Sequence, residues 1–476
     1  RKRLFRVGHK LRGIARSVGY VPPKYWGGDK SDVTDFLEEH PDRQDELVVL
    51  LESPETFPWD LTEPWLDELN KKYATCLYGN KHRVMYWPEN IHEPGVIQEG
   101  FLSRDDFRAV EVENGDKWLK HPQHSHYQQV IFAPGKKLSG DVYNMWQGFT
   151  VDPIEKPELV ERFWNHVHEN ICNRDPNLTS WVRSWCAGMF QDPGVPNGTA
   201  IVLRGKQGTG KSIFAEILGS LFGTKHYFHA SDNRQFTGNF NSHLMDKVLV
   251  FGDESYWGGD KRSEGALKRI ITEKTLIIEP KGVNSFTTPN CMHLILASNE
   301  EWVVPAGMRD ERRFAVFDMG NRHIQDFDYF GAIVEDMKNG GKEALLHDLL
   351  TYAIDQDYRK IPMTEGLRTQ QELSAPGEIK YLLDVAESGE YLPGYDGDEI
   401  PFGPFYDQYL IFLRSEARKN KLEKKLFGKM LRDMFGEPTQ KRLAIGDQYY
   451  RTRCYKPESF EHFKQKVDEL FSAKDK

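Results

Sequence analysis

The spacing of apolar residues changes several times along the chain and predicts segments of different construction. Apolar and aromatic residues on both sides of Gly79-Asn80 predict a β-hairpin over residues 73–87. Apolar spacings of three and four predict helices across residues 156–190. Between residues 199 and 320, short apolar runs alternate with helical stretches, which predicts an α/β core with a parallel sheet.

The C-terminal part reads as helical and then mixed. Helices are expected from His323 to about Leu383, followed by two more over residues 405–419 and 422–435. A hairpin is expected over residues 441–455, and two helices before a two-stranded ribbon resemble a winged-helix module. The predicted organisation is a lead-in (1–52), a small β-rich accessory domain (53–150), a collar-like helical segment (151–197), the α/β core (198–322), a helical segment (323–390) and a basic winged-helix-like domain (391–476).

Composition is that of a folded protein. At roughly 100–200 residues per domain, 476 residues suggest two to four domains. Hydrophobic residues at 39% and charged residues at 28% permit a packed core and exclude wholesale disorder. No apolar stretch reaches the ~18 residues of a membrane span. The five cysteines lie far apart without a Cys-x-x-Cys pair, which argues against a disulfide framework and a zinc site. We therefore expect no membrane partner and a cytoplasmic, reducing location.

Charge is unevenly distributed. The net charge of −9 means that any contact with nucleic acid must be local. The first twelve residues carry six basic side chains and no acid, and a second basic region runs from Arg414 to Arg453. Because the chain starts without Met, we expect it to be a fragment or a processed piece of a longer protein.

A glycine-rich loop follows the apolar strand Ile201-Val-Leu203. Residues 205–212 read Gly-x-x-x-x-Gly-Lys-Ser. Glycines let backbone N–H groups point at phosphate oxygens, Lys211 can bridge the β- and γ-phosphates, and the Ser212 hydroxyl can bind Mg²⁺. A chance glycine-rich turn is the alternative, but a strand before it and a helix after it favour nucleotide binding. The predicted ATP-binding residues are Gly205, Gln207, Gly208, Thr209, Gly210, Lys211 and Ser212.

Polar residues end two further predicted strands of the core. The run Val248–Phe251 leads through a glycine to Asp253 and Glu254. Asp253 fits the Mg²⁺ shell and Glu254 the activation of the attacking water, although two acids can also simply end a strand in solvent. Another strand ends in Ser298-Asn299, where Asn299 can orient water or the γ-phosphate or be an ordinary turn residue.

Several basic residues allow both a structural and a functional interpretation. Arg312 and Arg313 are either salt-bridge partners or an arginine finger for a nucleotide on a neighbouring subunit, and Arg309 is a third candidate. Lys281, in the turn of a hairpin expected over residues 275–286, is either a solvated lysine or a contact to a phosphate backbone. His121, His124 and His126 are expected to be surface histidines, because no acid or cysteine stands at ligand spacing.

Taken in order, the glycine loop, acidic pair, hairpin, asparagine and double arginine resemble a superfamily-three helicase, which is related to the AAA+ ATPases. Residues 203–212 (Leu-Arg-Gly-Lys-Gln-Gly-Thr-Gly-Lys-Ser), Leu267–Thr272 and Glu311-Arg-Arg-Phe resemble the helicase part of phage primase-helicases and primase-polymerases. Tyr143–Phe149 looks like the lead-in to that family's ATPase. The resemblance is good over residues 125–320, looser in the tail and weak before residue 60.

The resemblance implies a function. It implies a P-loop ATPase core in a ring, usually a hexamer, with Mg-ATP between subunits and single-stranded or forked DNA as partner. Lys211, Ser212, Asp253 and Glu254 would bind and hydrolyse ATP, Asn299 would be the sensor, and Lys281 would contact DNA in the channel. Better-known members have Lys-His at the hairpin tip, where this chain has Lys281-Gly282. The upstream module would be a primase or polymerase.

Two other classes of function remain open from sequence. A nucleotide-switched DNA-binding initiator or loader would grip DNA, hydrolyse ATP slowly and not translocate. A protein-remodelling ATPase would respond to polypeptide and be indifferent to DNA.

Overall fold

The computed structural model describes residues 19–20, 55–56, 64–88, 96, 98–232, 234–238, 240–254, 261–281, 284–416, 420–446 and 448–471. The expected lead-in (1–52) therefore lies outside the described residues, apart from Gly19–Tyr20 (β1), which pairs with Glu55–Thr56 (β2). Internal contacts divide the chain into two units, residues 1–75, 84–86 and 101–125, and residues 76–83, 87–100 and 126–476. Within the described residues, no helix has the length and apolar character needed to cross a membrane.

The first unit has a small aromatic core. Trp118 and Phe107 are fully buried and lie 5.1 Å apart between ring centres, and Tyr73 packs edge-on against Phe107 at 4.9 Å. Ser103 starts a helix with a capping box, in which its hydroxyl accepts from the backbone of Asp106. The helices here are α4 (Pro64–Lys72), α5 (Arg104–Val110) and α6 (Gly115–Leu119).

The predicted hairpin around Gly79-Asn80 is confirmed. Strands β3 (Tyr73–Tyr78) and β4 (Lys81–Tyr86) flank a two-residue turn, and both turn residues have positive φ, 55° and 58°. The sheet order is β5-β4-β3-β6. The other strands of this part are β5 (Gly100–Leu102), β6 (His126–Tyr127), β7 (Gln129–Ile131) and β8 (Val142–Asn144).

The three histidines behave differently from one another. His126 is exposed as expected, but His121 and His124 are half-buried. His124 shares a hydrogen bond of 2.9 Å with the Thr75 hydroxyl and packs on Trp118 at 5.1 Å. His124 is therefore a partly exposed histidine that packs on Trp118, a contact that the sequence did not predict. Among the described residues, no group of three His, Cys, Asp or Glu side chains is arranged to hold a metal ion.

The second unit contains a five-stranded, wholly parallel sheet, as predicted. Its order is β10-β11-β14-β9-β15. The strands are β9 (Ala200–Arg204), β10 (Tyr227–Ala230), β11 (Leu249–Gly252), β14 (His293–Ser298) and β15 (Phe314–Asp318). Both faces are covered, which is why these strands read as continuous apolar runs rather than as alternating ones.

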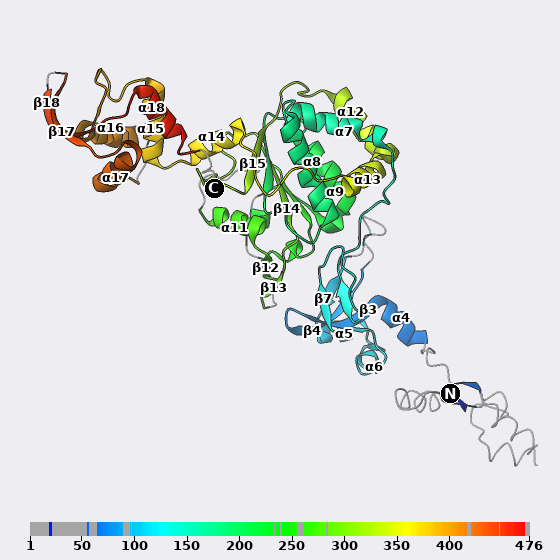
Figure 1. Ribbon diagram of the computed structural model, residues 1–476. Helices are drawn as coiled ribbons and strands as arrows, with labels where there is room; N and C mark the ends of the chain where they lie inside the picture. The colour runs from blue at the N-terminus through cyan, green and yellow to red at the C-terminus, as the bar shows by residue number, and fades with distance from the viewer. Residues whose placement is uncertain are drawn as a thin grey trace, which may run out of the picture. The chain divides into compact units, whose positions relative to one another are not determined.

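Strand β9 lies inside the sheet, between β14 and β15, and its residues Ala200–Leu203 are fully buried. Ala200 and Val202 share a cluster with residues of α11 (Lys261–Thr272) and α14 (Glu365–Ser374). Helix α9 (Lys211–His226) lies against β10, β11 and β14, and α13 (Lys342–Thr351) packs on α9 and α8. Figure 1 shows α8, α9 and α13 on one side of the sheet and α11 on the other.

The predicted helices before the core are present but segmented. They are η2 (Pro157–Leu159), α7 (Glu161–His166), the π-helical turn η3 (Val167–Ile171) and α8 (Pro176–Gln191). The Asp175 carboxylate caps α8 by accepting from the N–H groups of Asn177 and Leu178, and Pro176 occupies the first helical position. The remaining short elements are α10 (Arg234–Thr237), η4 (Ser242–Leu244), α12 (Phe327–Asp336) and η5 (Met337–Gly341).

The predicted hairpin between the acidic strand and the next core strand exists with a shifted return. Strand β12 (Thr275–Ile278) pairs with β13 (Phe286–Pro289), and Ile278 faces Phe286. The return strand was expected at residues 283–286. The buried face explains the shift, because Ile278 and Thr288 are buried while Ile277 is 63% exposed.

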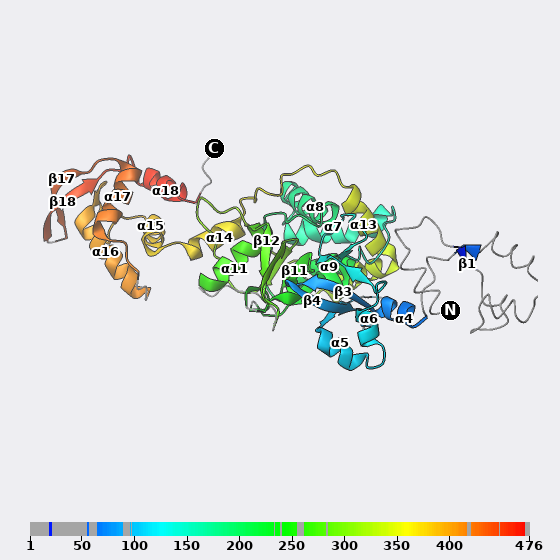
Figure 2. The same ribbon diagram turned by 90° about the horizontal axis from the view of Figure 1, so that it is seen from below.

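Residues 375–471 form a C-terminal domain with its own hydrophobic core. The order is α15 (Gly377–Ser388), β16 (Ile400–Pro401), α16 (Phe402–Ser415), α17 (Lys424–Phe435), β17 (Thr439–Ile445), β18 (Gln448–Tyr455) and α18 (Phe460–Asp468). The β17–β18 hairpin was expected (Figure 2). Helix α16 begins at Phe402 rather than Phe405, because Pro404 is tolerated in a first helical turn. Of its expected C-terminal end, residues 417–419 lie outside the described residues.

All five cysteines are buried. The segment before the core is tied to it by buried charges. The ammonium group of Lys225 contacts the carboxylates of Glu99 and Asp246, the latter at 2.9 Å. The Tyr143 hydroxyl donates to Glu99 at 2.8 Å. These bonds hold the segment that carries Tyr143 against the end of α9.

Candidate nucleotide site

The glycine-rich loop connects strand β9, which lies between β14 and β15, to helix α9. Gly208 and Gly210 have φ values of +79° and +90°, in the region that favours glycine. A Cβ atom on Gly210 would lie 2.5 Å from ring carbons of both His166 and Phe330. The backbone is therefore packed where a side chain has no room. The first N–H groups of α9 have no partner within the helix, and a helix N-terminus of this kind suits an anion.

The side chain of Lys211 lies inside the loop. Its ammonium group donates hydrogen bonds to the carbonyl oxygens of Gly205 at 2.6 Å and Lys206 at 2.8 Å. The Thr209 hydroxyl donates to the same Lys206 carbonyl at 2.9 Å, which closes the loop further. Burial lowers the pKa of Lys211, and the charges of Asp253 and Glu254 oppose that shift. The ammonium group of Lys211 is thus surrounded by backbone polar groups of the loop, whereas Lys206 is exposed.

The acidic pair stands beside the start of α9. The Ser212 hydroxyl donates to a carboxylate oxygen of Asp253 at 3.3 Å. The backbone N–H of Glu254 donates to the other Asp253 oxygen at 3.0 Å. Glu254 is exposed and has a φ of +50°, which is uncommon for a residue with a side chain. Such backbone conformations are concentrated at functional sites.

Asn299 lies at the same edge of the sheet. It directly follows β14, whose last residue, Ser298, accepts a hydrogen bond of 3.1 Å from the Gly205 N–H. The amide of Asn299 is exposed. Because β9, β11 and β14 are parallel neighbours, their carboxyl ends meet here. The structure therefore brings together the glycine loop, Lys211, Ser212, Asp253, Glu254 and Asn299.

The arginines lie at the opposite edge of the sheet. Arg312 and Arg313 precede β15, and the register aligns Phe314 with Ala200 at the start of β9. The five residues of β9 separate them from the glycine loop by about 17 Å, at roughly 3.3 Å per residue. Neither can reach the nucleotide site of its own chain along this sheet.

The loop that carries the arginines is organised by one carboxylate. Glu311 accepts backbone N–H groups from Gly307 at 2.7 Å, Arg312 at 3.0 Å and Arg313 at 2.7 Å. Arg312 is exposed, whereas Nε of Arg313 is buried without a hydrogen-bond partner among the described residues. Arg309 instead donates from Nε to the carbonyl oxygen of Glu469 at 2.5 Å.

Lys281 lies in the loop of the β12–β13 hairpin and is exposed. The neighbouring Asn241 fixes the hairpin, since its amide donates to the Ile277 carbonyl and accepts from the Glu279 N–H, both at 2.9 Å. Tyr78 packs against Phe286 at 5.1 Å on the returning strand. The hairpin is thus supported from both sides below Lys281, while Gly282 lies outside the described residues.

Two histidines at the site were missed by the sequence analysis. Nε2 of His229, on β10, lies 3.7 Å from a carboxylate oxygen of Asp253. His166 is buried beneath the loop, where its Nε2 contacts the Gly210 carbonyl at 3.3 Å and the Asn170 amide contacts its Nδ1 at 3.1 Å. Burial lowers the pKa of His166 to about 4. The ring is therefore neutral in the folded protein at neutral pH.

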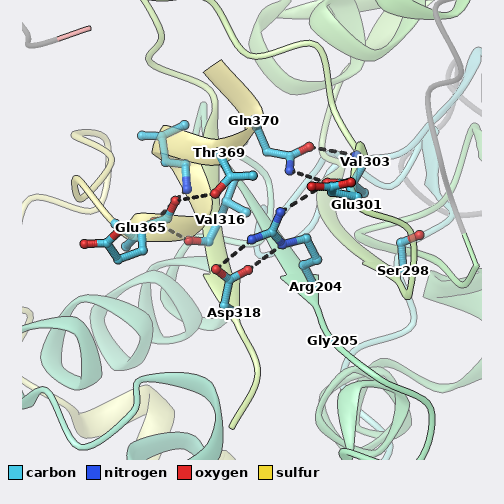
Figure 3. A network of polar contacts seen from close by, with 12 residues as sticks. Arg204, Gly205, Ser298, Glu301, Val303, Val316, Asp318, Glu365, Thr369 and Gln370 are labelled. Carbon is cyan, nitrogen blue, oxygen red and sulfur yellow. Dashed lines mark hydrogen bonds and ion pairs between the residues drawn. The ribbon is translucent and has the colours of Figure 1, made fainter. Parts of the chain in front are cut away.

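A polar network at the end of β9 was also missed (Figure 3). The Arg204 guanidinium donates twice to the Asp318 carboxylate, at 2.6 and 2.8 Å, and once to the Glu301 carbonyl at 3.2 Å. The Gln370 amide donates to that carbonyl at 2.7 Å and accepts from the N–H groups of Val303 and Val304. The network joins the base of the glycine loop to the segment after Asn299.

Known proteins resemble this chain over the same region. Residues 203–313 match a family described as a family of unknown function, DUF5906. A segment of 178 residues is 29% identical to the DNA primase-polymerase of Nitratiruptor phage NrS-1, and it covers 36% of this chain and 23% of that protein. The match therefore spans less than a quarter of the relative's length.

The fold matches solved structures of the same phage protein. An apo structure of the NrS-1 C-terminal region, in its A form, aligns with a TM-score of 0.58 at 18% identity, over 82% of this chain and 98% of that one. A second apo structure of this region aligns with a TM-score of 0.56 over 83% and 99%. This chain therefore has the α/β fold, with a parallel five-stranded sheet, of the C-terminal region of a phage primase-polymerase.

Proposed function

We propose that this chain is the ATP-driven DNA-translocating part of a phage-type replication protein, a superfamily-three helicase with an AAA+-like P-loop core. The observation that carries the proposal is the Ser212–Asp253 pair, 3.3 Å apart, beside a loop that encloses Lys211. In open parallel sheets, ligands bind at the carboxyl ends of the strands, which is where these residues lie. The likeness to a DNA primase-polymerase supports a role in phage replication, in the cytoplasm of the host.

The residues present suit Mg-ATP. The glycine loop is closed to side chains and bordered by a helix N-terminus, so it suits the phosphate chain. The Ser212 hydroxyl and the Asp253 carboxylate are oxygen ligands of the kind that Mg²⁺ prefers. A bound Mg²⁺ would neutralise charge on the phosphate oxygens. The ammonium group of Lys211 can exchange its hydrogen bonds to the carbonyl oxygens of Gly205 and Lys206 for hydrogen bonds to phosphate oxygens.

Each side chain then has one task. Lys211 would offer its positive charge to the β- and γ-phosphates, and Asp253 and Ser212 would hold the cation. Glu254, exposed next to Asp253, orients the attacking water and accepts its proton. Asn299 supplies an amide to the same water or to the γ-phosphate. Thr209, Gln207 and the loop glycines, Gly205, Gly208 and Gly210, shape the cradle.

The distance of about 17 Å between Arg313 and its own loop supports a site shared between subunits. An arginine at the amino edge of the sheet can complete the site of a neighbouring copy, as arginine fingers do. We propose Arg313 or Arg312 for this role in a ring, with six copies as the expected number. Arg309, which is bonded to Glu469, is a weaker candidate.

The hairpin supports a motor that contacts DNA. Lys281 is exposed on a hairpin that ATP hydrolysis itself does not need, and its charge suits the backbone of a single strand, including that of a fork. The C-terminal domain has the helix and strand order of a winged helix and is proposed as a second contact to DNA or to partner proteins. An upstream primase or polymerase module is proposed on the same grounds as the replication role.

The test is the rate of ATP hydrolysis by the purified chain with and without single-stranded DNA, with Lys211→Ala as the inactive control. A DNA-translocating ATPase predicts hydrolysis that is strongly stimulated by DNA and absent in the control. Slow hydrolysis with DNA binding but no strand displacement would favour an initiator or loader instead. Stimulation by polypeptide and none by DNA would favour a remodelling ATPase.

A further inference from the structure

One face of the β17–β18 hairpin carries only neutral and basic side chains. The pairing places Arg442 opposite Arg451, Gln440 opposite Arg453 and Ala444 opposite Tyr449. Residues two apart in a strand share a face, so all six side chains point the same way. All six are exposed, and Tyr449 is 75% exposed. This face, called the arginine face below, thus presents three guanidinium groups and no acid.

The two central arginines oppose each other directly. Like charges facing across an antiparallel pair destabilise a hairpin. Within the described part of the chain, neither Arg442 nor Arg451 has a carboxylate at ion-pair distance; Asp447, at the turn, lies outside it. The Arg442 guanidinium lies 5.7 Å from the centre of the Tyr449 ring. The arrangement therefore maintains a repulsion that the fold itself does not relieve.

On the opposite face of the same hairpin, the basic side chain of Lys441 is paired with an acid. Lys441 points there and forms an ion pair with Glu399, whose side chain is almost fully buried. One cation of the hairpin is thus neutralised within the domain while the arginine face is left with its charge. The contrast indicates that the arginine face serves an external anion.

The positive surface continues onto helix α17. The Arg453 guanidinium and the Lys424 ammonium group both lie over the Phe402 ring, at 5.1 and 5.9 Å from its centre. The Tyr455 hydroxyl donates to the Gly428 carbonyl at 2.7 Å, which fixes β18 against α17. Figure 2 shows β17 and β18 beside α17. Helix and hairpin therefore present one continuous basic surface.

We propose that the arginine face, together with the start of α17, binds the sugar-phosphate backbone of duplex DNA. Guanidinium groups bind phosphate with two parallel hydrogen bonds, and a two-stranded ribbon fits a groove of the duplex. A single exposed aromatic ring, Tyr449, does not make the row of stacking rings typical of single-strand sites. The inference rests on the proposed function only in taking DNA as the partner, and it requires no ATP hydrolysis.

The test uses the full chain without nucleotide. Binding to a fluorescent 20-base-pair duplex and to a 20-nucleotide single strand is measured by anisotropy over a series of salt concentrations. For Arg442→Gln with Arg451→Gln, we expect weaker duplex binding at every salt concentration. We also expect a slope of log K against log salt that is smaller by about 1.8, since each lost phosphate contact removes about 0.9. Single-strand binding should be unchanged, and the thermal midpoint should be equal or higher because the arginine repulsion is removed.

The matched control is Lys456→Gln with Lys464→Gln, which removes the same charge from the same domain away from the arginine face and should leave the duplex slope unchanged. An equal loss of slope in this control would overturn the proposal in favour of non-specific charge. An unchanged slope in the arginine variant, or an equal loss on the single strand, would also overturn it. The measurement is repeated on Lys211→Ala, because duplex binding by the arginine face should not depend on the nucleotide loop. Failure of the wild-type chain to hydrolyse ATP would refute the proposed function without affecting the duplex-binding result.

Discussion

The guanidinium of Arg204 donates two hydrogen bonds to the carboxylate of Asp318, at 2.6 and 2.8 Å. Arg204 is the last residue of β9, and the glycine loop starts at the next position. Asp318 is the last residue of the neighbouring strand β15, and the parallel register pairs it with Arg204. The two side chains therefore fix the carboxyl end of this strand pair at the point where the loop leaves it.

We expect Arg204→Lys to lower the free energy of unfolding by about 1–2 kcal/mol. Lysine cannot make the paired hydrogen bonds, and hydrogen bonds to charged groups contribute about 1.5–3 kcal/mol, less where the carboxylate is partly exposed. Denaturant unfolding measures the change. Arg162→Lys is the matched control, because Arg162 also bonds twice to an aspartate, Asp336, but is 59% exposed. A loss of similar size in both variants would contradict the special position of Arg204.

The core of the fold was predictable because its strands are buried on both faces. Runs such as Ile201–Leu203 and Val248–Phe251 contain no polar side chain, so their strand character and parallel arrangement follow from the residues alone. Helix α18 was missed although Ser459 caps it and Phe463 and Val467 are buried at helical spacing, because no element was predicted beyond the hairpin. The Arg204–Asp318 pair joins residues 114 positions apart. Such a contact follows only from the order of the strands, which no local pattern encodes.

We expect Glu254→Gln to reduce ATP hydrolysis by about 10²–10⁴-fold while nucleotide binding is retained. The amide keeps the shape of the side chain but cannot accept the proton of the attacking water. Hydrolysis rates and binding of a fluorescent ATP analogue separate the two effects. Equal loss of binding and hydrolysis would indicate that Glu254 supports the loop and does not act on water.

We expect Arg313→Ala, mixed with Glu254→Gln, to recover part of the activity that each variant lacks alone. Arg313 lies at the far edge of its own sheet, so a mixed ring contains some interfaces with both wild-type residues. The mixing experiment is repeated with Arg312→Ala, and only the variant that complements contains the finger. Complementation by neither variant would exclude both arginines from a shared site.

Only some residues of the nucleotide site could be predicted from the sequence. Lys211, Ser212, Asp253 and Glu254 directly follow strands, and residues at the carboxyl ends of neighbouring parallel strands must meet. His166 gave no such signal, because it lies on a helix 44 residues before Gly210 and touches only a backbone carbonyl there. The position of Arg312 and Arg313 at the edge of the sheet opposite the glycine loop follows only from the register of β15 with β9.

We expect Lys281→Ala to leave ATP hydrolysis without DNA unchanged and to abolish strand separation. Lys281 is exposed on a supported hairpin away from the acidic pair, so its removal takes away one charge without altering the nucleotide site. Unwinding of a fluorescent forked duplex is the measurement. Lys274→Ala, at the exposed base of the same hairpin, is the control and should unwind normally. Retained unwinding by the Lys281 variant would remove the hairpin from the mechanism.

The stability of the protein is expected to depend on pH through the buried ring of His166. Burial lowers the pKa of His166 to about 4, whereas in the unfolded chain it lies near 6.5. Between these values the unfolded state binds more protons than the folded one, so the free energy of unfolding falls as pH falls from about 6.5 to about 4. At pH 5 this one histidine costs about 2 kcal/mol relative to pH 7.

We expect His166→Gln to lose about 2 kcal/mol less stability than the wild type between pH 7 and pH 5. A glutamine amide can still donate to the Gly210 carbonyl and accept from Asn170, the two contacts that the neutral ring makes. Denaturant midpoints at the two pH values give the difference, and His82→Gln, at an exposed position, should leave it unchanged. Parallel pH profiles for the wild type and the His166 variant would show that another group controls the loss. A flatter pH profile for the His166 variant would mean that protonation of this ring destabilises the folded wild type. The neutral ring accepts from the Asn170 amide at Nδ1, and a protonated Nδ1 cannot accept that hydrogen bond.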